Sequence, residues 1–79
     1  FKYLSVWFAE SSMDREKVFK VLRDHGIKIQ TMDASLDIGK GSTKLTYLTK
    51  IPEALNIESL FKELRKVGDV EKVKIEENL

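Results

Sequence analysis

Apolar and polar residues alternate at the start of the chain, which is the pattern of a half-buried strand. Residues 1–9 are rich in aromatic and β-branched side chains and contain neither Gly nor Pro. The alternation separates two faces, with Leu4, Val6 and Phe8 on one and Tyr3, Ser5 and Trp7 on the other. We expect the purely apolar set to point into the core.

The apolar spacing then changes to that of a helix over residues 13–25. Positions i, i+3, i+4 and i+7 are occupied by Val18, Val21, Leu22 and His25. Ser11 or Ser12 is the expected N-cap, with Asp14 at capping-box spacing after Ser11. Gly26 is expected to end the helix in the left-handed conformation.

A second strand begins at Ile27 and Ile29, but its apolar positions then change parity. The later apolar residues are Met32, Ala34, Leu36 and Ile38. A strand cannot move its apolar residues to the other face without an extra residue, so we expect a β-bulge near residues 30 and 31.

The two glycines in residues 37–42 predict a hairpin turn into a third strand over residues 43–51. In that strand Leu45, Tyr47 and Ile51 share one parity, and Lys44, Thr46, Leu48 and Lys50 share the other.

The last third of the chain repeats the helix–glycine–strand pattern. Pro52 ends the third strand and Asn56 is the expected N-cap of a second helix. Its apolar positions are Ile57, Leu60, Phe61, Leu64 and Val67, and Gly68 follows them. A final strand over residues 70–75 turns Val73 and Ile75 inward, and residues 76–79 form a polar tail.

This order of elements predicts an α+β domain with a ferredoxin-like βαββαβ topology. In it, a four-stranded antiparallel sheet carries both helices on one face. Residues 1–79 make a single domain, because so short a chain cannot form two cores. The other face of the sheet has no helical cover.

Composition narrows the function classes. The net charge of +1, from 14 Lys and Arg against 13 Asp and Glu, argues against a dedicated DNA-binding domain. With no Cys and one His, disulfides and nitrogen–sulfur metal sites are excluded, and we expect neither a metal nor a cofactor. No run approaches the roughly 18 apolar residues of a spanning helix. Because the chain starts at Phe1 inside an apolar stretch, we expect a fragment of a longer protein.

A catalytic site is not expected. His25 reads as a helix-end residue that interacts with the helix dipole and partly lines the core, since no nucleophile or carboxylate is brought to it. Residues 39–42 (GKGS) lack the spacing of a phosphate loop and lie between two strands, so they read as a hairpin turn.

The uncovered sheet face is the candidate interaction surface. If Leu4, Val6 and Phe8 face the helices, the opposite face presents Tyr3, Trp7, Thr46 and Leu48 among several lysines. Exposed aromatic clusters usually mark a contact with another protein or domain. The same topology stacks single-stranded RNA in other proteins, but residues 44–49 (KLTYLT) lack the Gly-aromatic-x-aromatic pattern of such domains, so we expect no nucleic-acid partner.

Two segments resemble the ACT family of regulatory domains: VLRDHGIKI (residues 21–29) and LRKVGDVEKV (residues 64–73). The resemblance extends over the whole chain and implies a non-catalytic regulatory domain. Amino-acid-binding members carry a Pro-Gly turn after the first strand; here Glu10, Ser11, Ser12 and Met13 replace it. If an amino acid binds, the resemblance implies backbone at those four residues and near Gly26.

ACT-like domains without that turn occur as the cytoplasmic C-terminal module of MgtC/SapB-type membrane proteins, which this chain also resembles. The resemblance implies a cytoplasmic domain of an inner-membrane protein, with a role tied to magnesium limitation, acting through a homodimer or through contact with a protein partner. Two alternatives remain. One is an amino-acid sensor that controls an enzyme or transporter; the other is a small enzyme such as an acylphosphatase, whose Gly- and Arg-rich loop is missing after residue 9.

Overall fold

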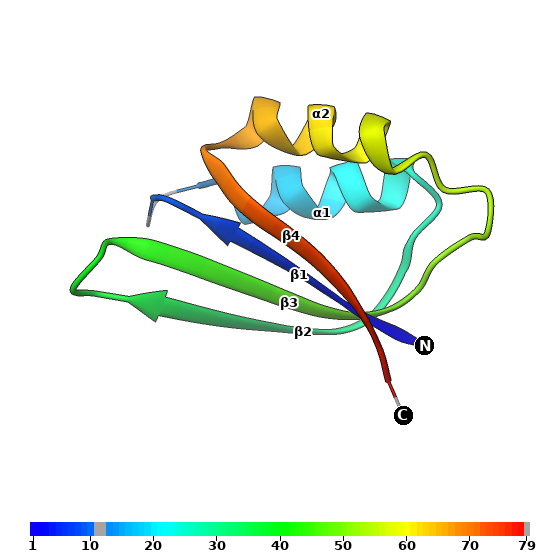
Figure 1. Ribbon diagram of the computed structural model, residues 1–79, viewed down its shortest axis with the longest axis horizontal. Coiled ribbons are helices and arrows are strands. Elements are labelled where there is room, and N and C mark those ends of the chain that lie inside the picture. Colours follow the sequence, from blue (N-terminus) through cyan, green and yellow to red (C-terminus); the bar gives the residue numbers. More distant parts are fainter. Residues whose placement is uncertain (11–12, 79) are drawn as a thin grey trace.

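The computed structural model describes residues 1–10 and 13–78 and confirms the predicted βαββαβ order. Its elements are β1 (Lys2–Phe8), α1 (Arg15–Asp24), β2 (Lys28–Asp37), β3 (Ser42–Lys50), α2 (Ile57–Val67) and β4 (Val70–Glu77). The strands form one antiparallel sheet in the order β2-β3-β1-β4. Both helices lie on the same side of this sheet, so the fold is ferredoxin-like (Figure 1).

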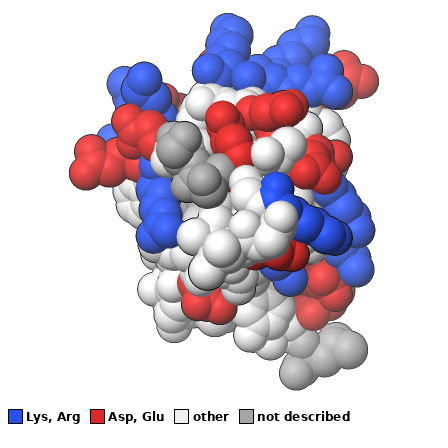
Figure 2. Space-filling model, turned by 90° about the vertical axis from the view of Figure 1, so that its left-hand side faces the viewer, with Lys and Arg blue, Asp and Glu red and all other residues white. Residues whose placement is uncertain are grey.

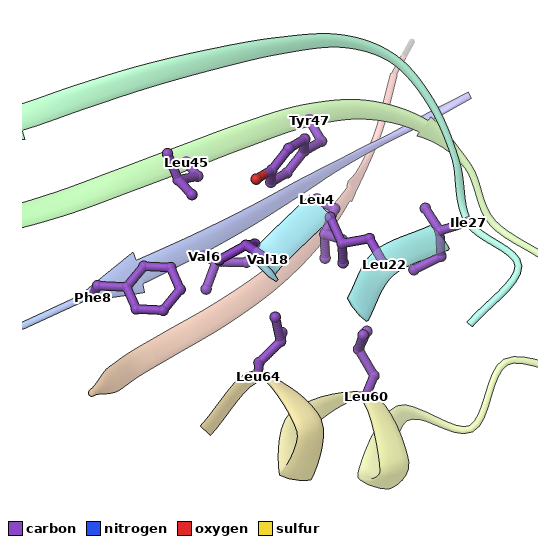
Figure 3. Close-up of a cluster of buried hydrophobic side chains, with 10 residues drawn as sticks. All are labelled: Leu4, Val6, Phe8, Val18, Leu22, Ile27, Leu45, Tyr47, Leu60 and Leu64. Carbon is purple, nitrogen blue, oxygen red and sulfur yellow. The ribbon is translucent and has the colours of Figure 1, made fainter. Parts of the chain in front are cut away.

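The core lies between the helices and the inner face of the sheet. Side chains from β1 and β3 point toward both helices (Figure 3). Ten hydrophobic residues are almost fully buried there: Leu4, Val6, Phe8, Val18, Leu22, Ile27, Leu45, Tyr47, Leu60 and Leu64. The alternation in β1 and β3 therefore predicted the correct faces, because the central strands present every second residue to the helices.

The predicted bulge in β2 is also present. The pairing of β2 with β3 shifts between Ile29 and Thr31, which leaves Gln30 as the extra residue. After the shift, Met32 and Ala34 lie opposite Tyr47 and Leu45 and thus on the helix-facing side. The inserted residue is what allows apolar positions on both sides of it to share one face.

Helix α1 begins later than the sequence pattern suggested. Asp14 is its N-cap, and the Asp14 carboxylate accepts hydrogen bonds from the backbone N–H groups of Glu16 and Lys17. The predicted caps Ser11 and Ser12 lie outside the described residues. Since an aspartate caps as well as a serine, the three capping residues within residues 11–14 left the helix start undecided.

Helix α2 has the predicted N-cap, because the Asn56 side chain accepts a hydrogen bond from the backbone N–H of Ser59 at 3.1 Å. Its predicted apolar stripe is narrower than expected. Leu60 and Leu64 are buried, whereas Ile57 is 47% and Phe61 38% exposed. The predicted polar tail is wrong for Glu76 and Glu77, which belong to β4 and pair with β1.

The two helix-ending glycines serve different purposes. Gly26 has φ +77°, the left-handed conformation predicted for it. Gly68 is extended, with φ −171°, so any residue could adopt its backbone. Its lack of a side chain is needed for space, because an added Cβ would meet the Glu10 carboxylate and would lie 3.2 Å from Phe8 Cδ1.

We therefore expect Gly68→Ala to lower the free energy of unfolding by about 1–3 kcal/mol, the usual effect of overpacking. The methyl group would displace Glu10, whose Oε1 accepts a hydrogen bond from the backbone N–H of Asp69 at 2.9 Å. Gly39→Ala is the matched control, since its Cβ would meet only Asp37 Oδ1 at 3.5 Å. Equal urea-denaturation midpoints for the two variants would contradict this account.

The buried phenol of Tyr47 makes stability depend on alkaline pH. Burial raises the pKa of Tyr47 to about 12 against the opposing effect of Arg15, while the unfolded chain keeps a pKa of 10.0. The contribution of the Tyr47 phenol to the free energy of unfolding is therefore fully present below pH 10. It is lost as the pH rises toward 12, because the unfolded state releases the proton first. Between pH 10 and 12 the free energy of unfolding of the unmodified protein should fall by about 3 kcal/mol more than that of Tyr47→Phe, which has no phenol to ionise. Urea unfolding curves of the two proteins at several pH values measure this difference. Parallel pH profiles would contradict this.

Candidate functional site

The open face of the sheet, which the helices do not cover, has Trp7 near one end. Trp7 lies opposite Lys44 on β3 and opposite Lys72 on β4. The two ammonium groups are 4.9 and 4.8 Å from the centre of the Trp7 ring. Because β3 and β4 flank β1, these lysines reach the indole from opposite sides.

The middle row of this face is polar. Ser5 pairs with Thr46 on β3 and Lys74 on β4. The Ser5 and Thr46 hydroxyl groups are 3.4 Å apart, and Ser5 is only 4% exposed. Lys74 Nζ lies 3.5 Å from the Glu76 carboxylate on the same strand. This polar row therefore separates the row that contains Trp7 from the row that contains Tyr3.

The third row contains the phenol of Tyr3. Tyr3 lies opposite Leu48 of β3 and opposite Glu76 of β4; Tyr3 is 39% exposed and Leu48 is half-buried. Beyond them, Lys50 Nζ lies 5.2 Å from the ring of Phe1, which is 54% exposed. Aromatic side chains thus lie on either side of the polar middle row, with ammonium groups beside them.

The structure places all four predicted interface residues, Tyr3, Trp7, Thr46 and Leu48, on this open face. Trp7 is less exposed than expected, because Lys44 and Lys72 flank it. In the described part of the chain neither of these two lysines forms an ion pair. Cation–π contact of this kind stabilises an ammonium group without neutralising it, so both charges stay available to a partner.

A shallow hollow of about 650 Å³ adjoins Trp7 at the hairpin end of the sheet. Its lining is mixed, with charged, hydroxyl and apolar side chains from the hairpin, from β1 and from the start of β4, among them Trp7, Ile38, Lys40, Ser42, Lys44 and Glu71. Sequence reasoning missed this hollow. Glu71 reaches it because the β1–β4 pairing shifts between Trp7 and Phe8, a bulge that no local sequence pattern indicates.

Of the residues predicted to hold an amino acid, the three that the structure describes, Glu10, Met13 and Gly26, do not form one site. Glu10 hydrogen-bonds to the backbone of Asp69, and Met13 packs against the core. Ser11 and Ser12 lie outside the described residues. Gly26 follows the far end of α1, a helix of 10 residues and hence about 15 Å long.

Both ring nitrogens of His25 have hydrogen-bond partners in the helix layer. Its Nδ1 lies 2.8 Å from the carbonyl oxygen of Val21, so Nδ1–H donates and Nε2 accepts from the Ser59 hydroxyl at 3.1 Å. These bonds tie the end of α1 to α2. The Ser59 contact corrects the expectation that no nucleophile is brought to His25. Residues 37–42 form the predicted hairpin turn, closed by Gly41 N–H donating to the Asp37 carbonyl.

Within residues 1–10 and 13–78, no three His, Cys, Asp or Glu side chains are grouped so that they could hold a metal ion. Within the same residues, neither helix has the length and apolar character needed to cross a membrane.

No protein-family model matches the chain, and no curated protein matches it.

Trp7→Lys tests the assignment of faces. We expect the variant to stay folded and to lose about 1–2 kcal/mol, because two cation–π contacts disappear and three ammonium groups then lie side by side. Phe8→Lys is the matched control; it puts a charge on the fully buried neighbouring position and should unfold the domain. Circular dichroism melts measure both, and an unfolded Trp7→Lys variant would invert the assignment.

Proposed function

We propose that this chain is a non-catalytic regulatory or association domain of a larger protein and that it acts by contact of its open sheet face with another protein surface. The observation that supports this most directly is that Trp7, Tyr3 and Leu48 lie on the uncovered face with lysines beside Trp7. Aromatic side chains are enriched in protein interfaces, and polar or charged groups surround them there. A complementary surface would bring apolar groups to the centre and carboxylates to the lysines.

Stacking of RNA bases is a poorer use of the same face. Base stacking needs a free aromatic surface, and the two lysines that flank Trp7 would first have to move aside. A protein surface needs no such rearrangement, because carboxylates can approach the ammonium groups where they stand.

For the parent protein we propose a membrane protein of the MgtC/SapB type, with this domain as its cytoplasmic C-terminal module. The support is the resemblance of residues 21–29 and 64–73 to ACT-like domains, together with the absence of the Pro-Gly turn at residues 10–13. The same resemblance ties the proposed regulation to magnesium limitation, without a magnesium site in this domain.

Trp7 is the only tryptophan of the chain and reports directly on the open face. We expect acrylamide to quench Trp7 emission about threefold less in the full-length protein, with its other tryptophans replaced by Phe, than in the free domain, because an apposed surface excludes the quencher.

Leu48→Glu should restore quenching in the full-length protein. Phe61→Glu, which changes a residue on α2 that is 38% exposed, should not. Equal quenching in the free domain and in the full-length protein would contradict the proposal. Titration calorimetry of the free domain with a panel of amino acids distinguishes an association domain from an amino-acid sensor. Saturable heat with one amino acid would favour the sensor.

A further inference from the structure

The side chains around Trp7 carry positive charge that the domain itself does not balance. Lys44 and Lys72 form no ion pair among the residues that the structure describes. Lys74 lies on the same open face, but its Nζ is 3.5 Å from the Glu76 carboxylate. A partner that carries carboxylates therefore gains most beside Trp7, where the ammonium groups have no carboxylate of their own.

The cations of the helix layer make a poorer recognition site. Figure 2 shows Lys and Arg gathered over the helix layer at the top of the view, with Asp and Glu next to them. In α1, for example, Glu16 and Asp24 lie among Lys17, Lys20 and Arg23. Mixed charges of this kind are typical of a solvated helix surface. The cations beside Trp7 differ because they flank an aromatic ring on a sheet.

A single carboxylate is too small to bind both of these lysines. Lys44 and Lys72 belong to the two strands that flank β1, so their Cα atoms lie two strand spacings, or about 10 Å, apart. Their ammonium groups are 4.9 and 4.8 Å from the centre of the indole ring that lies between them. One carboxylate can bridge two ammonium groups only within about 8 Å, because each hydrogen bond is about 2.8 Å long. Two carboxylates are therefore needed, one on each side of Trp7.

The distance between the lysines favours a helical partner. In a β-strand, side chains on one face repeat about every 7 Å, so two of them lie about 7 or about 13 Å apart. In an α-helix, residues i and i+7 share one face and lie about 10.5 Å apart along the axis. Residues i+3 and i+4 lie between them on the same face. A helix can therefore place one carboxylate near each lysine and an apolar side chain against Trp7.

The hollow beside Trp7 provides room for that apolar side chain. It has a volume of about 650 Å³, and Ile38 in its lining is 85% exposed. The charged residues of the lining include Asp37, whose Oδ1 accepts a hydrogen bond from the backbone N–H of Lys40 at 3.2 Å. Glu71 also lies in the lining and opposes an acidic partner. Its removal should therefore strengthen the contact.

We infer that the open face binds an acidic amphipathic α-helix from outside residues 1–79. Its carboxylates at i and i+7 pair with Lys44 and Lys72, and its apolar side chain at i+3 or i+4 packs against Trp7. The helix lies across the strands, on the face of the sheet opposite α1 and α2. This inference rests on the open-face function proposed above and names the chemistry of the partner.

Synthetic peptides test the spacing of the carboxylates. The probe is an Ala-rich helix of about 20 residues without Trp, which carries Glu at i and i+7 and Leu at i+3 and i+4. One control has Gln in place of both Glu, and the other exchanges the second Glu with the Leu at i+4. We expect the probe to protect Trp7 from acrylamide with a dissociation constant at least about fivefold lower than either control, because only its spacing reaches both ammonium groups. Equal binding of all three peptides, or binding of none, would overturn the inference.

Substitutions in the domain identify the groups that bind the probe peptide. Lys44→Gln and Lys72→Gln should each raise its dissociation constant at least about threefold, because each removes one ion pair. Glu71→Gln should lower the dissociation constant. Lys74→Gln is the matched control on the same face, since Lys74 already lies beside Glu76. Circular dichroism checks that all four variants are folded. An equal effect of Lys74→Gln would indicate general attraction of negative charge and would overturn the assignment of the two lysines.

The full-length protein separates this inference from the open-face function on which it rests. With Trp7 as its only tryptophan, the double variant Lys44→Gln, Lys72→Gln should lose the protection of Trp7 from acrylamide. A Trp7 that stays protected in the double variant would overturn the acidic helix and leave the open-face function standing. Equal quenching of the unmodified full-length protein and the free domain would instead contradict the open-face function itself.

Discussion

The position of β1 at the centre of the sheet constrains the rest of the molecule. β1 pairs along its length with β3 on one side and β4 on the other, so both rows of its backbone groups are committed. A shift by one residue would exchange Val6, which is fully buried, with Trp7. Alternate residues of β1 therefore belong to the core and to the open face. Because Leu4, Val6 and Phe8 are buried, Tyr3 and Trp7 must lie on the opposite side.

The neighbours of β1 decide what that opposite side is like. Lys44 and Lys72 lie beside Trp7 because the registers of β3 and β4 both place a lysine opposite it. Neither lysine is close to Trp7 in sequence. The lysines cover part of the indole and retain their charge, which is why this end of the face combines an aromatic centre with cations.

Sequence periodicity predicted everything that depends on which way a residue points. It gave the faces of β1 and β3, and it gave the bulge of β2, since Ile29 and Met32 could share a face only with an extra residue between them. Periodicity could not predict how far a neighbouring element extends. For this reason the exposure of Met32 was not foreseen: it lies on the helix-facing side, opposite the buried Tyr47, and is still 48% exposed.

Sequence patterns could not predict the start of α1, where several residues can act as the N-cap. They also could not predict why each helix ends in a glycine, because glycine can serve more than one purpose. Asp14 and the two preceding serines are all competent N-caps, and the cap in the structure is Asp14, which follows the core-packed Met13. Gly26 and Gly68 look alike in sequence, yet one supplies a positive φ and the other supplies space beside Phe8. The second reason depends on an approach between segments 60 residues apart in the chain, which no local pattern reports.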